Sequence, residues 1–197
     1  MNIFRLECCR SAKGCKQAVA NSQKLLAMLK EALSQNMVSE DDKAQQDNKI
    51  KQHEIFKVCV AGCANSCSQP QIKDFALIAR VKPEFSKELC TLCGLCCTAC
   101  REQGLQIKGQ ELLWQEDKCL GCGACWRTCP QGAIQPGEEK WRILIGGKLG
   151  RHPRLAIEVA ETDKKNALLY LRRAIDTILS SQEVSKRIAD RLFKEFA

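Results

Sequence analysis

The sequence lacks long apolar runs, and this excludes several classes of protein. The longest uninterrupted apolar stretch covers only a handful of residues, far short of the roughly 20 that a transmembrane helix needs. The first residues, MNIFRLECCRSAKGC, contain neither an apolar segment nor a small-residue cleavage site, so they do not resemble an ordinary signal peptide. We therefore expect a cytoplasmic protein without membrane contacts.

Aromatic residues are also scarce. They make up 5% of the chain, and none is interleaved with the basic residues of the segment GGKLGRHPR at 146–154. Proteins that bind single-stranded nucleic acid stack the bases on aromatic side chains beside basic grooves, so nucleic-acid binding is not expected. The chain still carries 31 Lys and Arg against 23 Asp and Glu, a formal net charge of +8, and this surplus indicates another anionic ligand.

Cysteine is abundant instead. The chain has 15 Cys in 197 residues, about 8%, which is near the level typical of disulfide scaffolds. A chain of this length can bury a core without disulfide staples. In a reducing cytosol, clustered cysteines indicate metal ligation. The cysteines fall in four groups, at 8–15, 59–67, 90–100 and 119–129.

Apolar periodicity outside these groups predicts an α+β fold. Residues 17–33 and 164–180 have helical spacing, and the apolar residues of 184–196 step by four, which indicates a last amphipathic helix. Segment 34–53 is polar and aperiodic and is expected to be a loop or linker. Short strands are expected at 55–60, 72–81, 141–145 and 155–159, with a hairpin at 104–115.

The simplest organisation is one α+β domain interrupted by a small inserted module. The outer domain consists of residues 1–82 and 137–197, and the second part ends in the C-terminal helices. The cysteine-rich module occupies residues 83–136.

Eight cysteines of the module repeat one spacing, C-x2-C-x2-C-x3-C. They are Cys90, Cys93, Cys96 and Cys100, then Cys119, Cys122, Cys125 and Cys129. Three thiolates at two-residue gaps reach three corners of a cubane, and the fourth ligates the neighbouring cluster. Zinc ribbons favour C-x2-C pairs separated by a longer stretch, so 4Fe–4S clusters are favoured over zinc and over disulfides. Cys97 does not fit the spacing and is expected to be a buried free thiol.

The module resembles a bacterial two-cluster ferredoxin. The crossed pairing of that family implies a first cluster on Cys90, Cys93, Cys96 and Cys129. It implies a second cluster on Cys119, Cys122, Cys125 and Cys100. Arg101 stands where the family usually has Pro, and we expect this difference to alter the local turn and not the ligation.

Two further cysteine pairs lie in the outer domain. Cys9 and Cys15 are spaced C-x5-C, and Cys63 and Cys67 are spaced C-x3-C within GCANSC. With the helix between the pairs, the strand after them and the string WRILIGGKLGRHPRLA, nearly the whole chain resembles siroheme nitrite and sulfite reductases. The ferredoxin insertion resembles dissimilatory and anaerobic sulfite reductase subunits. The residues alone leave open a row of buried thiols at 59, 63 and 67, or another metal.

The resemblance implies a third 4Fe–4S cluster on Cys9, Cys15, Cys63 and Cys67. Cys67 would also bridge this cluster to the siroheme iron. Siroheme is rich in carboxylates, which basic side chains bind through charge-assisted hydrogen bonds. The candidates are Lys148, Arg151, His152 and Arg154, and, around the first cysteine pair, Arg5, Arg10, Lys13 and Lys16. Cys8, Cys59 and Cys97 are left without a ligand role.

The family resemblance implies six-electron reduction of sulfite or nitrite, with electrons passed from a donor protein through the ferredoxin clusters. In the family, siroheme lies between two pseudo-symmetric halves, but only eight residues precede Cys9. We therefore expect a second subunit or a second copy to supply the other half. The alternative is a siroheme-free electron-transfer protein with three clusters. Three clusters of about −2 each would lower the formal charge of +8 to roughly +2, so the basic surplus is mostly an internal counter-charge.

Overall fold

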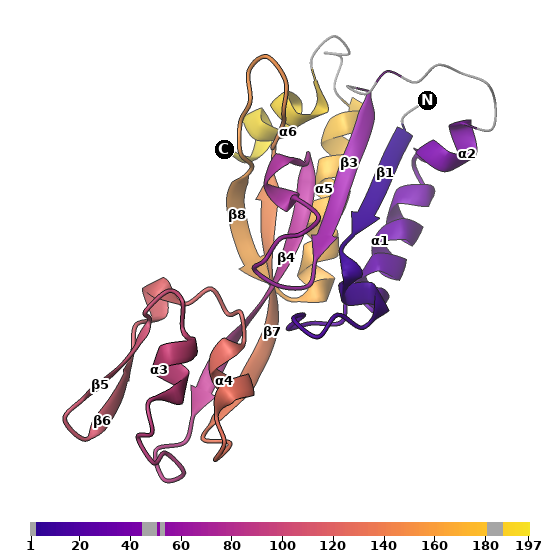
Figure 1. The fold of residues 1–197 in the computed structure, drawn as a ribbon. Helices are drawn as coiled ribbons and strands as arrows, with labels where there is room; N and C mark the ends of the chain where they lie inside the picture. Colours follow the sequence, from indigo (N-terminus) through magenta and orange to yellow (C-terminus); the bar gives the residue numbers. More distant parts are fainter. Residues whose placement is uncertain (1–2, 45–50, 52–53, 181–186) are drawn as a thin grey trace.

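A mixed sheet forms the larger part of the molecule, shown in Figure 1 as a computed structural model that describes residues 3–44, 51, 54–180 and 187–197. In chain order, the first four strands of the sheet run parallel to one another, the fifth runs antiparallel to the fourth, and the sixth runs antiparallel to the fifth. In spatial order the strands are β2 (Val38–Ser39), β1 (Ile3–Cys8), β3 (Ile55–Ala61), β4 (Phe75–Phe85), β7 (Ile134–Ile145) and β8 (Ile157–Thr162).

Helices cover one face of this sheet. They are α1 (Gln23–Ser34), α5 (Lys164–Ser180) and α6 (Ile188–Phe196), and a short helix, α2 (Glu40–Ala44), follows β2. Because side chains alternate along a strand, β3 directs Phe56, Val58 and Val60 to the helical face, where all three are fully buried. Trp141 of β7 and Leu171 of α5 are buried in the same core. Removal of this apolar layer from water is the main stabilising contribution.

The opposite face carries cysteine and small apolar side chains. They form a buried cluster of Cys59, Ala61, Ala76, Ile78 and Leu144. The loop between β3 and β4, which contains the 3-10 turn η2 (Pro70–Ile72), runs back along this face, because the two strands are parallel (Figure 1). The Ala156 amide donates to the Gln71 carbonyl at 2.7 Å, and the Gly147 amide donates to the Lys73 carbonyl at 2.9 Å. A Cβ on Gly147 would overlap the Gln71 carbonyl oxygen, so glycine permits this close crossing.

Strands β4 and β7 continue beyond the sheet and carry a small module at their far end (Figure 1). The ladder runs on through the pairs Pro83↔Pro136 and Phe85↔Ile134, so both strands cross the expected module boundaries. The core of the module contains Leu105, Cys125 and Ile134. Its elements are α3 (Leu95–Ala99), β5 (Leu105–Lys108), β6 (Glu111–Trp114), the 3-10 turn η3 (Glu116–Lys118) and α4 (Ala124–Thr128).

The structure confirms the hairpin of the module and the helix over 164–180, and it moves other expected bounds. Strand β4 begins at Phe75 and not at residue 72, and β7 begins at Ile134 and not at residue 141. The strand expected at 155–159 lies at 157–162. The last helix begins at Ile188, and residues 184–186 lie outside the described residues.

Two expectations near the N-terminal half were wrong. The helix expected from residue 17 begins only at Gln23, because the Val19 and Ala20 amides donate to the Gly62 carbonyl and not to a preceding turn. The polar segment 34–53 is not all loop, because it contains β2 and α2; residues 45–50 and 52–53 lie outside the described residues. Strand β1 had not been expected. Within the described ranges, no helix is long and apolar enough to cross a membrane.

Candidate metal centres

Four cysteines of the module line one narrow cavity. They are Cys90, Cys93, Cys96 and Cys129, the set that crossed pairing assigns to the first cluster. Three come from the loop around α3, and Cys129 comes from the second repeat. The cavity has a volume of about 20 Å³, little more than one water molecule occupies.

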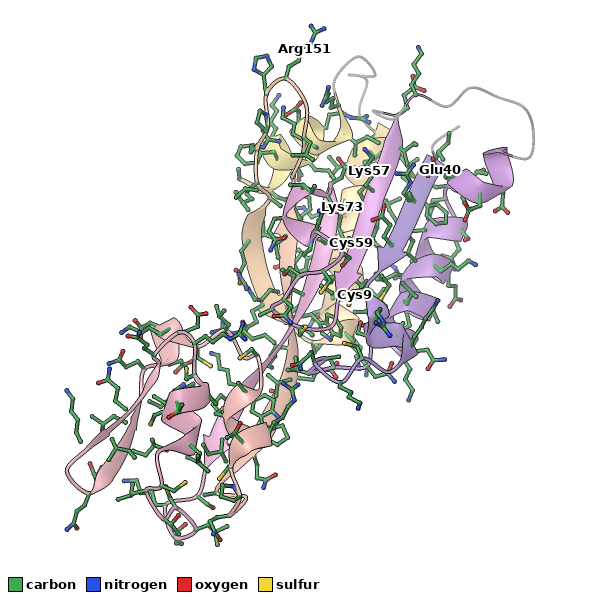
Figure 2. All side chains as sticks on the ribbon, in the orientation of Figure 1. Cys9, Glu40, Lys57, Cys59, Lys73 and Arg151 are labelled. Carbon is green, nitrogen blue, oxygen red and sulfur yellow. The ribbon has the colours of Figure 1, made fainter. Side chains whose placement is uncertain are left out.

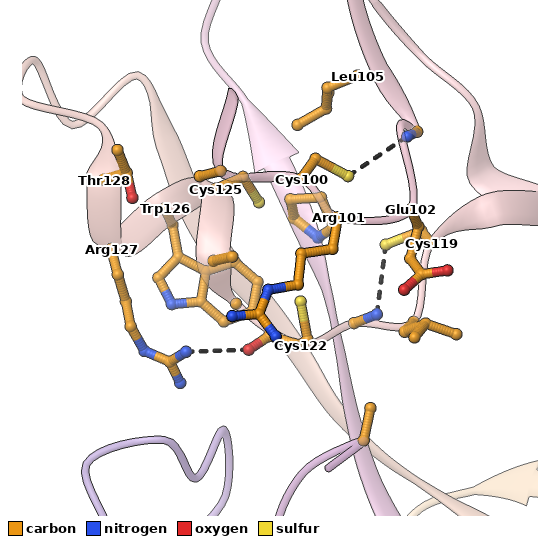
Figure 3. Close-up of a pocket in the computed structure, with 18 of the residues that line it drawn as sticks. Cys100, Arg101, Glu102, Leu105, Cys119, Cys122, Cys125, Trp126, Arg127 and Thr128 are labelled. Atoms are coloured by element: carbon orange, nitrogen blue, oxygen red, sulfur yellow. Dashed lines mark hydrogen bonds between the residues drawn. The ribbon is translucent and has the colours of Figure 1, made fainter. Parts of the chain in front are cut away.

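The other four cysteines of the two repeats line a much larger cavity of about 620 Å³. They are Cys100, Cys119, Cys122 and Cys125, the set assigned to the second cluster. Figure 3 shows their sulfur atoms arranged around one shared space. The structure thus sorts the eight cysteines into two quartets, each with three members of one repeat and the fourth member of the other.

Local backbone geometry produces these quartets. Gly94 and Gly123 have φ angles of 78° and 80° immediately before α3 and α4, a conformation that glycine adopts without steric cost. Each left-handed turn separates the second cysteine of its repeat from the third. Backbone amides also face the sulfurs: Gly104 N lies 3.3 Å from Cys100 Sγ, and Gly121 N lies 3.4 Å from Cys119 Sγ. Such amides stabilise thiolates, the ligand form of cysteine.

The outer domain brings its two cysteine pairs together at the cysteine-bearing end of the sheet. Cys9 follows β1, and Cys63 follows β3, where the Cys9 amide donates to the Val60 carbonyl at 3.0 Å. Burial raises the pKa of the Cys63 thiol, and the neighbouring thiolates of Cys9, Cys67 and Cys15 raise it further. All four predicted ligands of the third cluster are therefore electrostatic neighbours. Cys63 is buried, whereas Cys67 is exposed.

Cys9 and Cys8 differ in their surroundings. Burial acts to raise the pKa of Cys9, but hydrogen bonds with the Ser11 side chain and the Gly62 and Ser11 amides outweigh it, so this pKa lies below its ordinary value. Burial raises the pKa of Cys8, which packs against the helical core. Thus Cys9 faces the opposite side of the sheet from Cys8 and is the better thiolate, in keeping with the predicted C-x5-C pair.

The segment around Gly62 fits tightly. A Cβ at Gly62 would overlap the Ser11 side chain and lie 3.0 Å from the Ala20 carbonyl oxygen. Ser11 in turn is hydrogen-bonded to Ser22 at 2.7 Å, and both are buried. This packing fixes the segment before α1 against the residue that precedes Cys63. No pattern in the sequence indicated the serine pair.

The leftover cysteines lie in packed positions. Cys59 is fully buried in β3, its thiol lies 3.4 Å from the Ser68 carbonyl oxygen, and burial raises its pKa to about 11. Cys97 is half-buried beside the core of the module. Burial, with Cys97 as a neighbour, raises the pKa of Cys96 to about 12.

All fifteen cysteines are free thiols. Among the described residues, no three His, Cys, Asp or Glu side chains converge closely enough to hold a metal ion. A cubane makes a different demand, because each of its irons takes its own thiolate. The requirement is therefore a ring of cysteines around a space.

The basic loop at 146–154 lies at the other end of the sheet from the cysteines. Figure 2 shows Arg151 at the tip of this loop, far from Cys9. Lys148 binds Asp190 of α6 at 2.6 Å. Arg154 lies 3.2 Å from the same carboxylate, donates to the Gly146 and Ala189 carbonyls, and stacks 3.8 Å from the Phe193 ring centroid. Arg151 and His152 are exposed.

Contacts of the loop residues therefore attach α6 to the sheet, and the assignment of Lys148, Arg151, His152 and Arg154 to siroheme stays a prediction. The N-terminal basic residues divide in two. Arg5 forms an ion pair with Glu40, whereas Arg10, Lys13 and Lys16 are exposed on the segment that carries Cys9 and Cys15.

Two cysteine quartets in a ferredoxin-like module, joined to a helix-covered mixed sheet, define an iron–sulfur protein with a sulfite reductase-like fold. The fold is similar to the crystal structure of dissimilatory sulfite reductase I, with a TM-score of 0.68 and 15% identity over 99% of this chain and 51% of that chain. The family model of the nitrite and sulphite reductase 4Fe-4S domain matches residues 2–192. The chain belongs to this family, which confirms the resemblance inferred from the cysteine motifs and the expected α+β fold.

Curated relatives match about half of the chain. The coenzyme F420-dependent sulfite reductase of Methanocaldococcus jannaschii is 34% identical over 96 residues, 49% of this chain and 16% of that protein. A subunit of the anaerobic sulfite reductase of Salmonella typhimurium is 30% identical over 100 residues, 49% of this chain and 30% of that protein. The beta subunit of the dissimilatory-type sulfite reductase of Archaeoglobus fulgidus is 26% identical over 110 residues, 51% of this chain and 30% of that protein. The matched regions thus span less than a third of each relative.

Proposed function

We propose that the chain is an oxidoreductase of the nitrite and sulfite reductase type that holds three 4Fe–4S clusters. Electrons from a donor protein would pass through the module to the third cluster and to siroheme, for six-electron reduction of sulfite or nitrite. The observation that carries this proposal is the sorting of the module's cysteines into two crossed quartets, beside a third quartet at the end of the sheet.

The residues of the three sites fit iron–sulfur clusters to different degrees. The second quartet surrounds ample space and has amides aimed at Cys100 and Cys119. The third quartet has one thiol, Cys9, held by Ser11 and the Gly62 amide at 3.1 and 3.3 Å. The first quartet has the right members around a narrow space.

Siroheme supplies a tetrapyrrole iron at which sulfite or nitrite can take up several electrons in succession. We assign Cys67 as the ligand that would bridge the third cluster and the siroheme iron, because Cys67 is an exposed member of the third quartet. The exposed Arg10, Lys13 and Lys16 lie on the same Cys9–Cys15 segment and suit its carboxylates. Among the loop residues, Lys148 and Arg154 bind Asp190, and Arg151 lies at the other end of the sheet from Cys9. The N-terminal basic residues therefore suit a siroheme at Cys67 better than the loop does.

We further propose that residues 1–82 and 137–197 form one reductase half-domain, interrupted by the ferredoxin module at 83–136. A second subunit or a second copy of the chain would supply the other half of the siroheme site. Support comes from the fold match, which covers 51% of the dissimilatory enzyme's chain. The Salmonella and Archaeoglobus relatives are both described as subunits of their sulfite reductases.

A visible absorption spectrum tests the siroheme part of the proposal. The protein is expressed in a host that makes siroheme and purified without oxygen. The expected spectrum has a Soret band and a red band above the broad absorption of the clusters, and extraction yields a tetrapyrrole. In Cys67→Ser protein the haem bands should shift or disappear while the absorption of the two module clusters stays. A spectrum of clusters alone would instead support the siroheme-free electron-transfer protein.

A further inference from the structure

The second cysteine loop of the module is attached directly to the sheet. The Val81 amide of β4 donates to the Gly121 carbonyl at 3.3 Å, and the Arg80 guanidinium donates to the Cys119 carbonyl. A Cβ on Gly121 would lie 2.5 Å from Arg80 Cγ and 2.8 Å from the Val81 amide nitrogen. The loop that carries Cys119 and Cys122 therefore lies against the backbone of β4, in a fit that requires glycine.

Arg127 of α4 makes a second connection between module and sheet. One guanidinium nitrogen donates to the Cys122 carbonyl at 2.9 Å, as Figure 3 shows. Another donates to the Gln17 and Ala18 carbonyls at 3.2 and 3.1 Å. Gln17 and Ala18 follow Cys15, a predicted ligand of the third cluster. A single side chain thus holds the second quartet to the segment of the third.

The large cavity extends across this junction. Its lining includes Cys122 of the second quartet, Cys63 of the third quartet, and Ala64, Asn65 and Gln17 of the outer domain. The narrow cavity of the first quartet is different, because every residue that lines it lies between Cys90 and Ile134 of the module.

We propose that Arg127 is a positioning residue that holds the second quartet next to the third. Electrons then pass between the module and the outer domain through the second quartet, and the first quartet lies farther from the outer domain. This inference rests on the proposed function, because it concerns the order of its three sites. An electron passing between the second and third sites oxidises one site and reduces the other by one electron. No bond is formed or broken and no proton is transferred. The electron originates from a low-potential one-electron donor.

Matched cysteine variants test the order of the sites. Cys93 and Cys122 are both exposed and both stand second in their repeats, so Cys93→Ser and Cys122→Ser are matched substitutions in the first and second sites. The protein is loaded with iron and sulfide and reduced with dithionite, and its electron paramagnetic resonance spectrum is recorded. We expect the reduced second cluster to broaden the paramagnetic signal of the third cluster. Cys122→Ser should remove this broadening, and Cys93→Ser should leave it unchanged.

The opposite pattern would overturn the order of the sites while the proposed function stands. Wild-type protein without any signal from a third cluster would overturn both. These two failures are therefore distinguishable in one set of spectra.

Arg127 is tested in the same way, without touching a ligand. Arg101 is a suitable control, because it is exposed and lines the same cavity, and no hydrogen bond joins it to the outer domain within the described part of the chain. With full iron content in every variant, Arg127→Ala should narrow the third site's signal, Arg101→Ala should not, and Arg127→Lys should restore part of the broadening. Equal spectra for Arg127→Ala and wild type, with equal iron, would refute the positioning role.

Discussion

Asp74 gives a stability prediction whose size can be worked from the structure. Its side chain lies just before β4, and the residue is only 8% exposed. The carboxylate accepts a hydrogen bond from the Lys57 amide at 2.8 Å. Burial raises its pKa to about 7, although the Lys57 and Ala189 amides and the charges of Lys57 and Lys73 oppose the shift. Other charged residues that line the same cavity are Arg5, Lys148 and Arg187.

The sign follows from proton binding. The ordinary pKa of 3.8 applies to the unfolded chain and about 7 to the folded protein, so the folded state binds more protons between these values. The free energy of unfolding therefore falls as the pH rises through this window, and the effect is complete above pH 7. At 1.36 kcal/mol per pKa unit, the difference between 3.8 and about 7 gives a total of about 4 kcal/mol, of which about 2 kcal/mol is lost between pH 5.5 and 8.

Anaerobic urea unfolding of wild-type and Asp74→Asn protein measures this contribution. Asparagine has the same shape and can still accept the Lys57 amide, but it does not titrate. The stability of wild type relative to Asp74→Asn should fall by about 2 kcal/mol from pH 5.5 to pH 8. Asp176→Asn, at an exposed position on α5, should track wild type at both pH values. Parallel curves for Asp74→Asn and wild type would refute the reasoning.

Three further substitutions separate structural from ligand roles. Gly62→Ala forces a side chain into Ser11 and should lower the free energy of unfolding by about 1–3 kcal/mol. Iron analysis should show the loss of about four irons, the content of one cluster. An unchanged iron content would contradict the tight fit. Arg154→Gln should lower the free energy of unfolding by about 1–3 kcal/mol, whereas Arg151→Gln should change it by less than about 0.5 kcal/mol. Equal effects in urea unfolding would contradict a stabilising role for the contacts of Arg154 with α6. Cys67→Ser should leave the two module clusters visible by electron paramagnetic resonance, and their loss would contradict the assignment of Cys67 to the third site.

The cysteine spacing carried most of the information about the site. C-x2-C-x2-C-x3-C depends on local backbone geometry, and Gly94 and Gly123 produce that geometry within the motif itself. The crossed partition of Cys100 and Cys129 rests on the same local geometry, and the cysteines that line the two cavities agree with it, while the ligand assignment stays a prediction. The amphipathic helix α5 was predictable for the same reason, because its apolar stripe is local.

Features that depend on distant segments were not predictable. Strand β1 is only six residues long, and its place in the sheet comes from pairing with β3, far along the chain. The helix at 17–33 loses its first turn because the Val19 and Ala20 amides bind the Gly62 carbonyl. Strand β7 extends back to Ile134 because it pairs with β4 as far as Phe85.

The basic loop shows the limit of charge patterns. The sequence predicts Lys148 and Arg154 as ligands for an anionic cofactor, but in the structure both bind Asp190. Nothing in the local sequence links residues 148 and 154 to a carboxylate on a C-terminal helix. Conversely, Arg127 stands inside a cysteine motif, and the sequence does not indicate that it reaches Gln17.

Iron and acid-labile sulfide counts, with zinc measured in the same samples, test the account's central claim most directly. Anaerobically purified protein should contain about twelve irons and twelve sulfides per chain, the content of three 4Fe–4S clusters. The triple variant Cys9→Ser, Cys15→Ser and Cys63→Ser should contain about eight of each, because the module keeps its two clusters. Fewer than about eight irons in wild type, with stoichiometric zinc in their place, would contradict the account.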